Sequence, residues 1–106
     1  MREGLLQRLH DLERRYEELE GLLASPEVIK APDLYQRYAK EYADLRRVVD
    51  PFRRLQAIER EIEEDRSLLE EGDEEMRVMA REEIARLQQQ KEEVERELRV
   101  ALLPID

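Results

Sequence analysis

Residues 68–76 read LLEEGDEEM, and this stretch decides how the chain folds. On both sides of it, apolar side chains recur every three or four positions, which is typical of amphipathic helices. Gly72 is the residue type that most often follows a helix C-terminus, and Asp73 is a preferred helix N-cap residue. So short a connection makes the flanking helices antiparallel neighbours. The stretch therefore predicts a helical hairpin whose tip lies at Gly72.

Prolines set the expected ends of this hairpin. Asp50 and Pro51 combine a capping carboxylate with a residue suited to the first helical turn, so we expect one helix over about 51–71. Pro104 disfavours helical geometry in the residue before it, so we expect the second helix over about 74–102. These bounds give a long hairpin with an apolar seam along its length.

Two charged residues interrupt that seam. Asp65 and Lys91 take positions at which the helical spacing would place an apolar side chain. The simplest interpretation is that each extends to solvent or pairs with a nearby charge. The register expected from the short turn places Lys91 near Leu55.

Upstream of the hairpin, the apolar spacing predicts two more helices, over about 3–24 and 32–49. Between them, Ser25 and Pro26 have the residue types of an N-cap and first position, which predicts a short helical turn. We expect the two N-terminal helices to cover the hairpin. The predicted fold is then an all-α helical bundle in which residues 1–106 form a single helical domain.

The composition excludes most kinds of chemistry. The chain contains no cysteine and one histidine, His10, which excludes thiolate nucleophiles, disulfides and sites built from several histidines. No glycine-rich loop is present that could hold a phosphate. We therefore expect no enzyme activity and no catalytic, cofactor-binding or metal-binding residue. No apolar run is long enough to cross a membrane, so we expect a cytoplasmic protein without a membrane partner.

Charge is distributed unevenly along the chain. The net charge of −9 opposes nucleic-acid binding except through a local basic patch, and residues 37–54 hold six basic and three acidic side chains. This basic segment either binds phosphate or an acidic protein, or is an ordinary solvated face. Residues 70–75 hold five carboxylates, and those before Gly72 lie at a helix C-terminus, where the helix dipole disfavours negative charge. We hypothesise that this acidic tip faces a basic partner. The candidate partner contacts are Arg46, Arg47, Arg53, Arg54, Glu70, Glu71, Asp73, Glu74 and Glu75.

Three tyrosines, Tyr35, Tyr38 and Tyr42, share one face of the helix predicted over 32–49. Aromatic rings on one face can stack on RNA bases. A stripe at helical spacing is more typical of a face that packs against another element. We therefore expect the rings to pack against the hairpin and to leave their hydroxyl groups at the edge.

Five stretches of the chain carry a family resemblance. They are Leu9–Leu19, Ser25–Ile29, Tyr38–Leu45, Asp73–Ala80 and Leu102–Pro104. In their order and spacing, over nearly the whole chain, they resemble the N-terminal helical domain of the bacterial peptide chain release factor 1 family, a class I release factor.

This resemblance implies a role in translation termination and protein biosynthesis. Such factors bind the ribosome, read a stop codon and promote hydrolysis of peptidyl-tRNA. The codon-reading Pro-x-Thr and the Gly-Gly-Gln motif of the family do not occur in this sequence, so the stop-codon-reading and Gly-Gly-Gln domains are expected to be absent from this chain.

The resemblance also implies partners. They are the large-subunit stalk-base protein and ribosomal RNA of the factor-binding region, the termination GTPase, and the remaining domains of the parent chain. From the residues alone, the alternative is a free-standing acidic coiled-coil adaptor or oligomerisation module, which would show a concentration-dependent mass.

Overall fold

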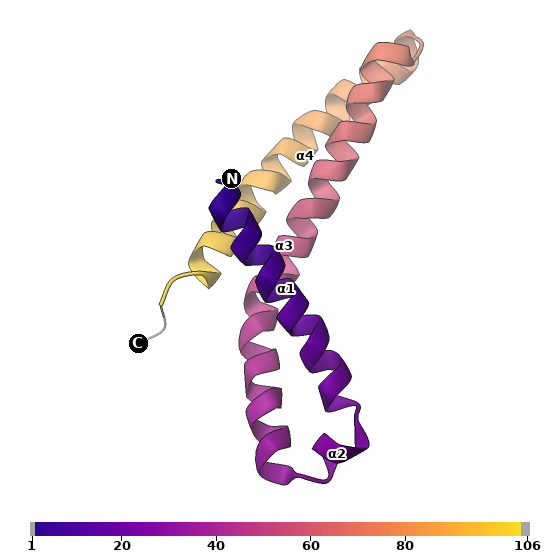
Figure 1. Ribbon diagram of the computed structural model, residues 1–106. Helices are drawn as coiled ribbons and strands as arrows, with labels where there is room; N and C mark the ends of the chain where they lie inside the picture. Colours follow the sequence, from indigo (N-terminus) through magenta and orange to yellow (C-terminus); the bar gives the residue numbers. More distant parts are fainter. Residues whose placement is uncertain (1, 105–106) are drawn as a thin grey trace. The chain divides into compact units, whose positions relative to one another are not determined.

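A computed structural model describes residues 2–104, which contain four helices and no strand. The all-α fold predicted from the sequence is confirmed. The helices are α1 (Glu3–Leu23), α2 (Pro26–Ile29), α3 (Pro32–Glu71) and α4 (Glu74–Ala101) (Figure 1). The chain divides into two compact units, an N-terminal unit of residues 1–50 and a hairpin unit of residues 51–106. That the N-terminal helices cover the hairpin in a single domain stays a prediction.

In the N-terminal unit, α1 and the first part of α3 run in opposite directions, with α2 at the turn between them (Figure 1). The Ser25 hydroxyl accepts a hydrogen bond from the Val28 backbone N–H at 3.4 Å, and Pro26 occupies the first helical position. The predicted capped turn is therefore confirmed. The ring of Tyr16 on α1 stacks on Tyr42 of α3, with centroids 4.4 Å apart and an angle of 11° between the planes.

In the hairpin unit, the second part of α3 pairs with α4 across a short turn (Figure 1). The Asp73 carboxylate accepts a hydrogen bond from the Met76 backbone N–H at 2.9 Å, which confirms Asp73 as the N-cap of α4. Burying one aliphatic side chain contributes about 1.5–3 kcal/mol. The seam is built from such buried side chains, namely Leu55, Ile62, Leu87, Val94 and Leu98.

The helix break predicted at residues 49–51 is absent, because α3 continues through Pro51. Proline inside a helix lacks an N–H donor and crowds the preceding turn, at a cost of about 3 kcal/mol. Here Pro51 is buried, together with Val49 and Phe52 beside it. Removing this apolar surface from water offsets the cost of the proline. Asp50, predicted as a cap, instead accepts a bond from Arg46 Nε at 3.3 Å.

Gly72 permits the hairpin turn through its small size. Its φ is not positive, so the left-handed conformation common at helix ends is not the reason for glycine here. A Cβ at this position would lie 2.6 Å from the Leu68 carbonyl oxygen and 2.9 Å from the Cβ of Met76. Any larger residue would therefore push the two helix ends apart.

Lys91 contacts a residue of α3 one helical turn closer to the tip than predicted. Lys91 Nζ lies 3.5 Å from Oε2 of Glu59, four residues closer to the tip than the expected neighbour Leu55. Helical side chains lean toward the N-terminus of their own helix. On α3 they lean away from the tip and on α4 toward it, so each α4 side chain meets an α3 residue closer to the tip than a symmetrical turn implies. Lys91 forms an ion pair there, as one of the two sequence interpretations proposed.

Candidate interaction surfaces

The basic segment lies within α3 and is divided between the two units. In the N-terminal unit, Arg46 is paired with Asp50, whose carboxylate raises the pKa of the guanidinium. Arg47 is exposed and has no ion-pair partner among residues 2–104. Arg47 is therefore available to an external anion, as is Arg37, which is also exposed and has no ion-pair partner in the described part of the chain.

In the hairpin unit, Arg53 and Arg54 are exposed. Nη2 of Arg54 lies 2.5 Å from Oε1 of Glu97 on α4, so its charge is compensated within the unit. The four candidate arginines, which the predicted break at residues 49–51 would divide between two helices, lie along the single helix α3.

The hairpin tip combines exposed carboxylates with exposed methionines. Glu74 pairs with Arg77 at 2.9 Å, and Asp73 is occupied as the N-cap. The carboxylates of three further glutamates are exposed and have no ion-pair partner in the part of the chain that the structure describes; they are Glu70, Glu71 and Glu75. Close in sequence, Met76 and Met79 are 48% and 65% exposed. The tip thus offers both negative charge and apolar contact.

Sequence reasoning missed the exposed methionines. Met76 follows the helical spacing of the apolar residues of α4, which predicts that it lies in the apolar seam. The seam reaches full burial only from Ala80 onward, one turn farther from the tip. The exposure of Met76 follows from where burial begins along α4. The spacing of apolar residues alone does not show that position.

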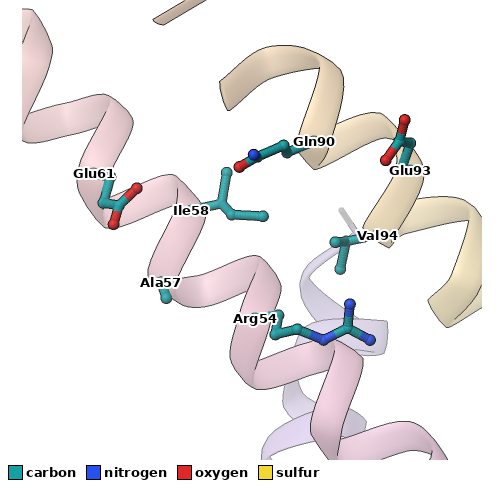
Figure 2. A pocket seen from close by; sticks show the side chains of 7 residues that line it. All are labelled: Arg54, Ala57, Ile58, Glu61, Gln90, Glu93 and Val94. Atoms are coloured by element: carbon teal, nitrogen blue, oxygen red, sulfur yellow. The ribbon is translucent and has the colours of Figure 1, made fainter. Parts of the chain in front are cut away.

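A groove of about 390 Å³ lies between α3 and α4 in the hairpin unit. Figure 2 shows Ile58 extending from α3 toward α4, with Gln90 and Val94 on the facing helix. Apolar and charged side chains line it together. The complete lining is Arg54, Ala57, Ile58, Glu61, Gln90, Glu93 and Val94. Such a groove has room for one or two side chains.

Within the N-terminal unit, the tyrosine face of α3 packs on α1, a neighbour that the sequence did not predict. The hydrogen bond with Tyr16, together with burial, raises the pKa of Tyr42 to about 12, and the Tyr42 hydroxyl donates to Glu20 at 3.3 Å. The guanidinium carbon of Arg15 lies 5.7 Å from the ring centroid of Tyr38. Tyr35 alone of these three tyrosines is exposed, at 40%.

A two-pronged ion pair joins α1 to α3 beside these rings. Arg15 donates from Nε and Nη2 to the two carboxylate oxygens of Glu41, at 2.7 and 2.9 Å. Arg15 also bonds Glu18 at 2.7 Å. The bond from Arg15 lowers the pKa of Glu41, and the same bond raises the pKa of Arg15. These groups hold the N-terminal unit together, which leaves its other surfaces for binding.

Within residues 2–104, no three histidine, aspartate or glutamate side chains converge in a way that could hold a metal ion. None of the helices described there has the length and apolar character needed to cross a membrane.

Comparison with known families identifies what this helical arrangement belongs to. The sequence model of one protein family, the PCRF domain, matches residues 12–106. The chain belongs to the PCRF domain family. The chain is 45% identical over 102 residues to peptide chain release factor 1 of Syntrophus aciditrophicus (strain SB). It is 41% identical over 103 residues to the protein of that name in Geobacillus sp. (strain WCH70).

Both alignments cover 96% of the chain but 29% of each relative. The chain thus spans less than a third of the length of these relatives. The resemblance inferred from the five sequence stretches is confirmed. No solved structure matches the chain.

Proposed function

We propose that this PCRF domain acts in translation termination as the N-terminal domain of a peptide chain release factor. The observation that carries the proposal is the match over residues 12–106, together with 45% identity to a release factor 1 along nearly the whole chain. In this role the domain works in the cytoplasm and binds the ribosome. Stop-codon reading and peptidyl-tRNA hydrolysis belong to other domains of the parent factor.

The proposed docking position is the factor-binding region of the large ribosomal subunit, on the stalk-base protein and its ribosomal RNA. Arg47 suits a phosphate of that RNA, because its guanidinium is exposed and locally unpaired. The tip suits a basic protein surface, since its carboxylates repel phosphate and its methionines add apolar contact. Communication with the termination GTPase would use the same exposed surfaces.

A chimaeric release factor tests this proposal. The PCRF domain replaces the matching segment of release factor 1 from Geobacillus sp. (strain WCH70), and sedimentation with ribosomes and stop-codon-dependent peptide release are measured. We expect the chimaera to bind ribosomes and to release peptide, whereas a factor without the segment binds more weakly. Equal binding with and without the segment would refute the docking role.

Variants of the chimaera test which exposed surfaces of the domain contact the ribosome. Arg47→Ala should weaken ribosome binding several-fold and reduce its salt dependence, because one phosphate contact is lost. Arg8→Ala on α1 is the matched control, since Arg8 is also exposed and is expected to leave binding unchanged. Equal effects of the two substitutions would remove Arg47 from the proposed contact.

The tip is tested by a triple neutralisation that leaves its N-cap and its ion pair intact. Glu70→Gln, Glu71→Gln and Glu75→Gln together should weaken binding, because three charges facing a basic partner disappear. The control carries Glu64→Gln, Glu82→Gln and Glu92→Gln, which change net charge equally at other exposed positions. If both triple variants bind alike, the tip is not a contact, and a concentration-dependent mass of the isolated chain would favour the oligomerisation module.

A further inference from the structure

Asp65 is a buried acid in the seam of the hairpin. Its side chain lies on α3 with the residue 8% exposed. Its Oδ2 atom is buried and has no hydrogen-bond partner among residues 2–104. An ionised carboxylate in such a place is costly unless a donor or a positive charge satisfies it. The sequence interpretations, extension to solvent or an ion pair, do not describe this residue.

The group that interacts with Asp65 is a second carboxyl, that of Glu83 on α4. A hydrogen bond with Asp65, and then the negative charge of Asp65, raise the pKa of Glu83. Glu61 on α3 adds further negative charge, while Arg86 acts in the opposite direction, with Nη2 at 3.8 Å from Oε2 of Glu83. Arg86 is thus the cation next to this pair, and it lies on the Glu83 side.

Two ionised carboxylates contain only acceptors, so they cannot form a hydrogen bond with each other. A proton on either one supplies the missing donor and removes the repulsion between them. The Asp65 oxygen is screened from solvent, which favours a proton over a larger cation there, while the Glu83 side chain is 45% exposed.

We propose that Asp65 and Glu83 share one proton across the seam between α3 and α4, and that this proton links the stability of the hairpin to pH. When the pair loses it, the proton passes to solvent and two carboxylates face each other. This inference concerns the hairpin itself and does not depend on the proposed role in termination.

The direction of the effect follows from the pKa of Glu83, which is raised in the folded state. The pair therefore contributes stability that is fully present below the pKa of glutamate in the unfolded chain. That contribution is lost as the pH rises through the higher pKa of the folded state. The hairpin should lose this part of its stability between acidic and neutral pH.

Unfolding of the 106-residue chain by heat, measured between acidic and neutral pH, tests the proposal. Asp65→Asn should raise the melting temperature at neutral pH, because its amide donates a hydrogen bond to Glu83 without needing a proton. At acidic pH the variant and the parent should melt at similar temperatures. The control Glu64→Gln removes an exposed charge one position earlier and should keep the pH dependence of the parent. If Asp65→Asn follows the control at every pH, the proposal fails.

A carboxyl NMR titration of the parent chain reads the pair directly, without any substitution. The Glu83 resonance of the parent chain should titrate above the ordinary range of glutamate, and Asp65→Asn should lower its pKa. A Glu83 pKa in the ordinary range in the parent chain would overturn the proposal. So would a raised pKa that Asp65→Asn leaves unchanged.

Discussion

The N-terminal unit and the hairpin unit pair their helices by different means. In the N-terminal unit, α1 contacts α3 through the stacked rings of Tyr16 and Tyr42 and through the two-pronged bond from Arg15 to Glu41. In the hairpin unit, α3 contacts α4 through a row of aliphatic side chains. Only there does a buried acid, Asp65, break the row.

This difference indicates what each pairing depends on. Rings and forked ion pairs have directional geometry, so the N-terminal unit depends on which chemical groups meet in addition to its buried aliphatic side chains, such as Leu9 and Leu19. Aliphatic side chains have no such direction, so the hairpin depends on filled volume. Substitutions that change either the chemical group or the filled volume distinguish the N-terminal unit from the hairpin unit.

The largest effect is expected from Leu87→Ala in the hairpin. Leu87 is 1% exposed, and truncating a buried leucine leaves a cavity that costs about 2–5 kcal/mol of unfolding free energy. Denaturant unfolding followed by circular dichroism measures the loss. The control Met79→Ala, at an exposed position of the same helix, should change stability by less than about 0.5 kcal/mol. Similar values for both would contradict a volume-dependent seam.

Gly72→Ala should have the next largest effect. The added methyl group would collide with the Leu68 carbonyl oxygen and the Met76 side chain, and such overpacking costs about 1–3 kcal/mol. Denaturant unfolding measures the cost. Gly21→Ala is the control, because nothing lies within 4 Å of the added Cβ and alanine favours helix. A Gly72→Ala chain as stable as the parent would show that the turn relaxes easily.

Tyr16→Leu tests the directional character of the N-terminal unit. Leucine keeps the site apolar but removes the stacked ring, which contributes about 0.5–1.5 kcal/mol beyond area burial. The free energy of unfolding should fall by an amount in this range. Tyr35→Leu makes the same change at an exposed ring and should be nearly neutral. If both substitutions are neutral, the units do not differ in the way described.

The smallest expected effect is a shift in titration. The pKa of Tyr42 is about 12, against an ordinary value of about 10. Because the folded pKa is raised, the stability gained from the protonated phenol is present below the ordinary value and is lost as the pH rises through about 12. Phenolate absorbance, as the difference between the parent and Tyr42→Phe, measures the pKa. Tyr16→Phe should lower it, and an unchanged value would remove Tyr16 as the cause.

Local signals predicted much of this fold. Ser25 and Asp73 were identified as N-caps from residue type and position, because capping depends on the next few residues alone. Pro51 misled the same reasoning. Its effect depends on burial beside Val49 and Phe52, which the local sequence does not reveal. The predicted neighbour of Lys91 on α3 was wrong by one helical turn. The spacing of apolar residues predicts which face of a helix is buried but not the direction in which its side chains lean.

The candidate sites were predictable in part. The sequence singled out Asp65 as a misplaced charge but gave no means of finding Glu83, which meets it from another helix. It also grouped Glu70 and Glu74 as equivalent contacts. Only the structure separates Glu74, which is paired with Arg77, from carboxylates that have no such partner in the described part of the chain.

The last turn of α3 has a consequence for how the tip behaves in solution. Its terminal carbonyl groups carry the negative end of the helix dipole, and Glu70 and Glu71 stand beside them with no basic residue in that turn. Mobile cations screen this repulsion. Fraying of the tip should therefore be greatest in dilute buffer, and raising the ionic strength should lengthen the helix from that end.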